Sequence, residues 1–187
     1  MMRSLWRTLL LGSLLGCAAQ GPEAVALISG LAGAQQVVTL TNLHPHGSKL
    51  SAVNYQQDGL IPVCSAVTIL SLSNEKLEFR VESTWQQYAY FYHRAAVEPF
   101  GRHLARYFGA SCPQADLDAL SAAERQHVEA GDVAPGMSRR AVIFAIGYPP
   151  LSATPRLEAP KWRYWRSRFR TMLVVFGSDG RVAEIER

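Results

Sequence analysis

The segment Lys161–Arg170 holds the strongest chemical pattern of the chain. It reads K-W-R-Y-W-R-S-R-F-R, with five cations, four aromatic rings and no acid in ten residues. Arginine and aromatic side chains are enriched at interface hot spots, and the same mixture can hold single-stranded nucleic acid by stacking and phosphate contacts. A plainer alternative is a strand with a solvated face, whose arginines pair with Glu184 and Glu186. The candidate contact residues are Lys161, Arg163, Trp165, Arg166, Arg168 and Arg170.

The N-terminal sequence predicts that the protein is exported, so that Lys161–Arg170 would lie outside the cytosol. Met1–Arg7 has two arginines and no acid, and a short leucine-rich run leads to Leu14-Leu15-Gly16-Cys17. A charged start, an apolar run and small residues at the break are typical of a secretory signal peptide. The last four residues resemble the bacterial lipobox, which implies cleavage after residue 16 and acylation of Cys17. The alternatives are an ordinary signal peptide with a chance cysteine, or an uncleaved anchor.

This resemblance also implies a location. Two or more acyl chains hold a protein on a membrane stably, whereas one chain binds only marginally. In such lipoproteins an aspartate directly after the cysteine favours the inner membrane, and here Ala18 follows Cys17. We therefore expect a signal peptide over 1–16, a tether over 17–36, and an outer-membrane anchor that faces the periplasm.

Two further cysteines remain in the mature chain, Cys64 and Cys112. In an oxidising compartment two such thiols more often form a disulfide than stay reduced, so we predict a Cys64–Cys112 bridge. Two buried free thiols are the alternative. A thiol nucleophile beside a histidine is a third, but no local signature of such an enzyme is present. The candidate histidines are His44, His93, His103 and His127.

Other chemistry has weaker sequence support. His44 and His46 have the spacing of a metal pair on a strand, but Pro45 lies between them and a third ligand is not evident nearby. Pairs of acids such as Asp116 and Asp118 fit solvated helix faces, and the chain has neither a phosphate-binding glycine loop nor a G-x-S-x-G elbow. We predict no catalytic site, no metal and no cofactor.

Composition narrows the class of protein further. The 187 residues are 48% hydrophobic and 18% charged, which is typical of a globular domain and not of a disordered chain. The net charge is +4, but removal of Arg3 and Arg7 with the signal peptide leaves 17 basic and 15 acidic residues, a net +2. With export, this balance argues against a nucleic-acid partner. The anions within reach would be lipid headgroups, lipopolysaccharide phosphates and acidic protein patches.

The elements expected to position the basic segment fall into two parts. Residues 37–110 have a β-like texture, with strands expected over 37–41, 60–63, 66–70, 77–81 and 85–92. Short strands joined by turns favour a small barrel or curled sheet, similar to SH3-like β-barrels. A helix over 95–108, closed by Gly109, is expected to end this domain.

Residues 111–187 predict helices followed by a three-stranded antiparallel meander, which makes the chain α+β. One helix is expected over 117–130, with a capping box between Ser121 and Glu124. A second is expected to begin at Ser138 and to end at Gly147. Strands are expected over 162–166, 171–176 and 181–185.

The last third is similar to the SmpA/OmlA family of small outer-membrane lipoproteins, the BamE-like domain. The match spans about residues 118–187. Its elements are Gly136-Met137-Ser138, Ile146-Gly147-Tyr148-Pro149, Trp162-Arg163-Tyr164, Val174-Val175-Phe176 and Asp179-Gly180-Arg181-Val182. The resemblance implies that 111–187 is a BamE-like helix and sheet domain, with Trp162 and Tyr164 on the helix-covered face.

An inward position of Trp162 and Tyr164 restricts the path of the residues that follow them. A regular strand would turn Arg166, Arg168 and Arg170 to the same face as Trp162, and a core cannot hold them unpaired. We therefore predict a turn or bulge near Ser167, with Arg163 and Arg166 in water and Trp165 partly exposed.

The sequence thus favours a non-enzymatic, lipid-anchored module that binds another envelope protein. A binding module for a small anionic envelope ligand, a lipid headgroup or a cell-wall fragment, is the alternative. The oligomeric state stays open.

Overall fold

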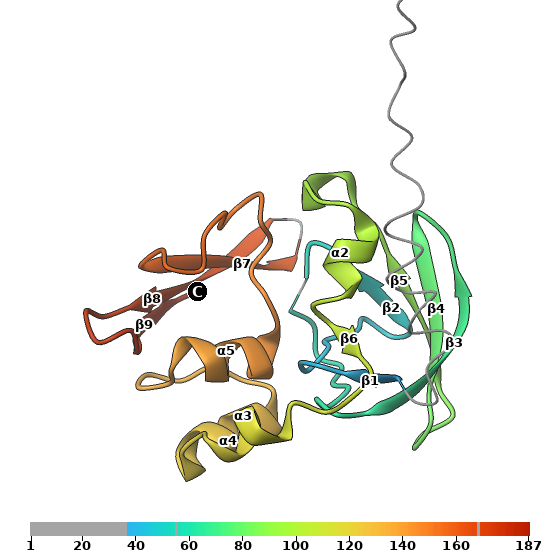
Figure 1. Cartoon of the computed structure of the whole chain (residues 1–187). Helices are drawn as coiled ribbons and strands as arrows, with labels where there is room; N and C mark the ends of the chain where they lie inside the picture. Colours follow the sequence, from blue (N-terminus) through green and yellow to red (C-terminus); the bar gives the residue numbers. More distant parts are fainter. Residues whose placement is uncertain (1–36, 55, 168) are drawn as a thin grey trace, which may run out of the picture.

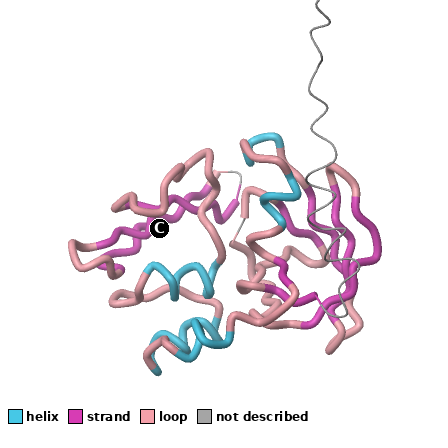
Figure 2. Tube along the Cα trace, viewed as in Figure 1, coloured by secondary structure: helices cyan, strands magenta, loops and turns pink. Residues whose placement is uncertain are grey.

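The computed structural model describes residues 37–54, 56–167 and 169–187. The predicted signal peptide, Cys17 and the tether lie outside the described residues, as does Arg168. The described chain forms two parts, each with its own sheet, which lie side by side (Figure 1). Strands dominate the first part, and the second combines short helices with strands (Figure 2). The predicted α+β class is confirmed.

The N-terminal part is a curled six-stranded sheet with the order β2-β5-β4-β3-β1-β6. Neighbouring strands are antiparallel except β2, which pairs in parallel with β5. Strand β4 shows why the sheet has one apolar face, because Leu77, Phe79 and Val81 alternate inward with polar residues outward. The strands are β1 (Val37–Thr39), β2 (Lys49–Ser51), β3 (Ala66–Leu72), β4 (Lys76–Val81), β5 (Gln87–Phe91) and β6 (Phe108–Gly109).

The prediction of one continuous helix over 95–108 is wrong. Two short helices, η1 (Arg94–Ala96) and α2 (Phe100–Leu104), replace it, and Gly109 lies in β6 instead of capping a helix. Val97, expected on the inner face, has a φ of 56° and is 65% exposed. Pro99 explains the break, because it offers no N–H to a preceding turn and disfavours helical conformation in the residue before it. The expected apolar spacing is still used, since Phe100, Leu104 and Phe108 are buried in the first core.

The C-terminal part combines three helices with a three-stranded antiparallel sheet of order β7-β8-β9. The single helix expected over 117–130 is two helices, since α3 ends at Asp118 and α4 begins at Ala122. Ser121 caps α4 in a capping box with Glu124, as predicted. The elements are α3 (Gln114–Asp118), α4 (Ala122–Ala130), α5 (Arg139–Ile146), β7 (Lys161–Ser167), β8 (Arg170–Phe176) and β9 (Val182–Glu186).

Helix α5 is the centre of the second core. Ser138 caps its start and Gly147 follows its end, as predicted. One side of the helix packs with the inner face of the sheet, where Trp162, Tyr164 and Val174 are fully buried. Glu124 ties the start of α5 to α4, because its carboxylate accepts hydrogen bonds from the backbone N–H groups of Ser121 and Ser138. Burial alone would raise the pKa of Glu124, but these hydrogen bonds lower the pKa to about 2.

The C-terminal end of α5 points at the N-terminal part (Figure 1). That part supplies hydrogen-bond donors to the last carbonyls of the helix. The last carbonyls of a helix have no partner within the helix. Here the N–H of Asn42 donates to the Phe144 carbonyl at 2.9 Å, and the Asn42 amide Nδ2 donates to Ala145 at 3.1 Å. The Asn54 amide Nδ2 donates to the carbonyls of Ile146 and Tyr148, at 2.9 and 2.8 Å. Two polar side chains of the first part therefore hold the two parts together.

Among the described residues, no helix has the length and apolarity needed to cross a bilayer.

Candidate interaction surface

The hairpin of β7 and β8 carries the basic-aromatic segment. On its inner face, Trp162 Nε1 donates to the Leu157 carbonyl at 3.1 Å, and the Tyr164 hydroxyl donates to the Gly147 carbonyl at 3.0 Å. Both rings are fully buried against α5, which confirms the predicted inner face. The bond to Gly147 also fixes β7 against the end of α5.

The regular strand ends where we predicted. The register between β7 and β8 shifts between Trp165 and Ser167, and Ser167 then pairs with Arg170. The Ser167 hydroxyl oxygen accepts hydrogen bonds from the backbone N–H groups of Phe169 and Arg170, at 3.3 and 3.2 Å. This irregularity turns the exposed Arg166 away from the core.

The structure divides the candidate contact residues into two groups. Lys161, Arg163 and Trp165 lie on the outer face of the sheet, where the two cations are exposed and Trp165 is half-buried. Arg166 and Arg170 are exposed at the end of the hairpin, with Phe169 85% exposed between them. We call this end the hairpin tip, defined by Arg166, Phe169 and Arg170. Arg168 falls outside the described residues.

The expected pairing of these cations with Glu184 and Glu186 occurs only once in the described chain. Lys161 Nζ lies 3.4 Å from a Glu186 carboxylate oxygen, and both side chains are about half exposed. No described carboxylate lies within ion-pair distance of Arg163, Arg166 or Arg170. The charges of the hairpin tip are therefore available to an outside partner.

The N-terminal part supports the hairpin tip from behind. The N–H of Gln56 donates to the Trp165 carbonyl at 2.8 Å, and Gln57 Nε2 donates to the Arg166 carbonyl at 2.6 Å. Backbone atoms of the hairpin are thus held by a loop from the other part. Arginine side chains then project from a backbone that is already ordered, which lowers the entropy lost when a partner binds.

A pocket of about 410 Å³ lies between this hairpin and β2. Leu50 and Phe91 give it an apolar lining, while His46 and Lys49 bring polar and cationic groups. Of the hairpin, Ser167 alone among the described residues lines this pocket.

The structure separates the environments of His44 and His46. His44 Nε2 donates to the Ala145 carbonyl at 2.9 Å, so this nitrogen helps to hold the end of α5 against the N-terminal part. Burial lowers the pKa of His44, which favours the neutral ring. His46 is exposed, and within 37–54, 56–167 and 169–187 no three metal-ligating side chains come together.

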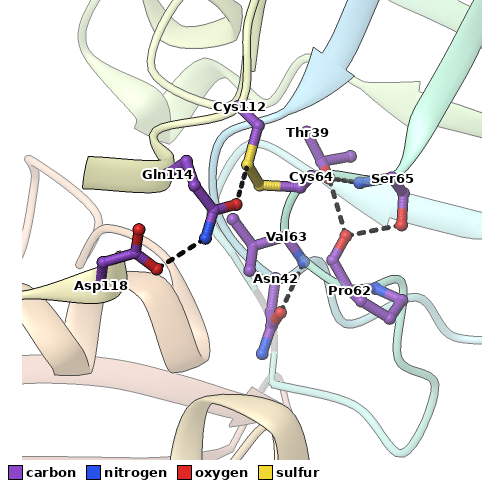
Figure 3. Close-up of a disulfide and its surroundings, with 9 residues drawn as sticks. All are labelled: Thr39, Asn42, Pro62, Val63, Cys64, Ser65, Cys112, Gln114 and Asp118. Carbon is purple, nitrogen blue, oxygen red and sulfur yellow. Dashed lines mark hydrogen bonds between the residues drawn. A yellow bond between two sulfur atoms is a disulfide. The ribbon is translucent and has the colours of Figure 1, made fainter. Parts of the chain in front are cut away.

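Cys64 and Cys112 are disulfide-bonded, as predicted (Figure 3). Their Cα atoms lie 4.9 Å apart, within the range usual for disulfides. Cys64 follows Val63 in a loop of the N-terminal part, and Cys112 lies just before α3. The Gln114 side chain lies beside the sulfur atoms and donates to Asp118 at 2.8 Å. The bond thus joins the two parts, and neither thiol is free to act with a histidine.

Sequence reasoning missed a buried polar network in the first core. The Tyr90 hydroxyl lies 2.8 Å from His103 Nε2, and His103 Nδ1 lies 3.1 Å from a Glu98 oxygen. Arg106 pairs with the same carboxylate. Burial raises the pKa of Tyr90 and lowers the pKa of His103. Tyr90 is 1% exposed, so this network lies inside the first core and orders it. The spacing of Glu98 and His103, five residues apart, is not that of a helical pair, so the sequence gives no signal for this network.

Comparisons of this chain with protein-family models, with curated proteins and with solved structures gave no match. The functional interpretation therefore rests on the chain's own sequence and geometry.

The disulfide leads to a prediction about stability. Replacing both cysteines, with Cys64→Ser and Cys112→Ser, should lower the free energy of unfolding by up to about 4 kcal/mol, since the bond closes a loop with a sequence separation of 48. Urea unfolding of the wild type and the double variant measures the difference. Peptide mapping without reductant is the control, and two alkylatable thiols in protein from an oxidising compartment would contradict the bond.

Proposed function

We propose that this chain is a lipid-anchored periplasmic module of the outer membrane that binds another envelope protein and catalyses no reaction. The lipobox-like Leu14-Leu15-Gly16-Cys17 supports the anchor. A disulfide that joins the two parts is in keeping with an oxidising compartment such as the periplasm.

The fold adds support for a BamE-like C-terminal part. Gly136-Met137-Ser138 leads into α5 and Ile146-Gly147 ends it, which is the place that the family pattern gives these residues. Trp162 and Tyr164 face the helix from β7. For the N-terminal part, a curled sheet of short strands is in keeping with an SH3-like barrel.

The observation that carries the proposal is the hairpin tip. It presents Arg166 and Arg170 without a described carboxylate in ion-pair distance, beside the exposed ring of Phe169. The hydrogen bonds from Gln56 and Gln57 order the backbone beneath it. An ordered, cationic and aromatic projection fits an acidic patch on a protein partner, because arginine and aromatic residues dominate such contacts.

The pocket beside β2 supports the second candidate, a small anionic ligand with an apolar portion. Lys49 could pair with the anion while Leu50 and Phe91 contact the apolar portion. Lipid headgroups and cell-wall fragments belong to this class. The protein partner is the stronger proposal. Arg166 and Arg170 do not line this pocket, so a small ligand bound there would leave both cations without a role.

The anchor is tested by metabolic labelling with a clickable fatty acid. Wild-type chain should take up the label and Cys17→Ser should not, because the thiol of Cys17 is the acceptor. Equal labelling of both proteins would refute acylation at this residue.

The hairpin tip is tested by charge reversal. Arg166→Glu with Arg170→Glu should weaken crosslinking to the envelope partner about tenfold, since two attractive contacts become repulsive. Thermal unfolding should stay near that of the wild type, because both side chains are exposed.

The matched control is Arg102→Glu with Arg156→Glu, which changes the net charge equally at two exposed positions away from the tip. Equal capture by both double variants would contradict the role of the tip. Loss of binding to vesicles with anionic lipid, with protein capture unchanged, would instead favour the small-ligand candidate.

A further inference from the structure

On the outer face of the three-stranded sheet, the described side chains are exposed or half-buried. Strand register places its residues in two rows that run across the sheet. Lys161, Val175 and Glu184 form one row, and Arg163, Leu173 and Glu186 form the next. We call these six residues the outer sheet face.

The middle of this face is apolar. Leu173 and Val175 lie on β8, are each half-buried, and pack in neither of the two cores. Trp165 lies on the same face, one step further along β7. The open face of an antiparallel sheet is usually polar. An apolar centre with charged edges is the anatomy of an interface.

The two edges of the face have opposite charge. Strand β7 contributes the cations Lys161 and Arg163, and β9 contributes the anions Glu184 and Glu186. Each row thus runs from a cation through an aliphatic residue to an anion. Such a pattern is complementary to a second copy of the face when the β7 edge of one copy lies against the β9 edge of the other.

We propose that the outer sheet face binds the same face of a second copy of this chain, with a two-fold axis parallel to β8. Rotation about this axis keeps each row at its own level and exchanges β7 with β9. Lys161 then faces the partner subunit's Glu184, and Arg163 faces the partner subunit's Glu186. Val175 and Leu173 meet their own copies in the centre, as an isologous interface requires.

Charge selects this orientation over the other face-to-face arrangement. A two-fold axis across the strands would stack β7 on β7, and would bring cations against cations and anions against anions. The chosen axis instead keeps the strands of the two sheets nearly aligned, which is a common way for sheets to pack. The single ion pair within the face, Lys161 to Glu186, is about half exposed and can exchange partners.

The face is small, and its size predicts the strength of the dimer. Three strands spaced about 4.8 Å apart, each with about five residues, make a footprint below that of a standard stable interface. We therefore expect a weak dimer that forms as the concentration rises. This inference does not depend on the lipid anchor or on the hairpin tip.

Charge exchange between two variants tests the proposal. Sedimentation velocity of the full chain with Cys17→Ser, over a range of concentrations, measures the dimer. Adding Arg163→Glu should raise the dissociation constant about tenfold or more, since both copies of this contact become like-charged. Glu186→Arg should do the same. The two variants mixed should dimerise again, because the glutamate introduced in one variant then faces the arginine introduced in the other.

Arg102→Glu is the control, because it changes an exposed charge in the other part and should leave the dimer unchanged. Thermal unfolding shows whether each variant stays folded. A chain that is monomeric at all concentrations would overturn the proposal, and so would a dimer that ignores Arg163→Glu or is not restored by mixing. Binding of a different protein to this face by a strictly monomeric chain would overturn it as well.

Discussion

The fold depends on how the end of α5 is completed. A helix of eight residues leaves half of its carbonyls without partners inside the helix. Here the N–H of Gly147 bonds to the Ile143 carbonyl, and the N-terminal part bonds to the other three, those of Phe144, Ala145 and Ile146. A buried carbonyl without a hydrogen bond costs about 1–3 kcal/mol, so several of them together would be prohibitive. Asn42, His44, Asn54 and Gln56 provide the missing donors from segments about one hundred residues away. The two parts are therefore parts of one body, and the disulfide holds the same junction covalently.

This junction positions the hairpin that we assign to partner binding. Gly147, which follows α5, accepts the hydrogen bond that fixes Tyr164 and with it β7. The loop that supplies Asn54 and Gln56 also binds the backbone of the hairpin at Trp165. A single set of polar contacts thus orients the sheet and orders the hairpin tip. The charged and aromatic side chains of the surface lie on β7 and β8, while the hydrogen bonds that fix their backbone come from a loop of the N-terminal part.

Local signals made part of this structure predictable. The caps at Ser121 and Ser138 were readable because a capping side chain bonds to a backbone only three residues away. The break near Ser167 followed from an incompatibility between a buried face and unpaired arginines. One helix over 95–108 is ruled out by Pro99, because proline interrupts a helix even where the apolar spacing on both sides is helical. The role of Asn42 was hidden, because an amide that caps a distant helix leaves no pattern in the sequence around it. The uncovered sheet face was hidden too, since it appears only once the register of three strands is known.

Calorimetry of the full chain tests the central claim, that buried polar contacts join the two parts into one folding unit. If they do, heating should give one transition whose calorimetric enthalpy equals its van't Hoff enthalpy. The same single transition, at a lower temperature, should remain for Asn42→Ala, because loss of the amide weakens the whole body and not one half. Two separate transitions in the wild type would contradict the account.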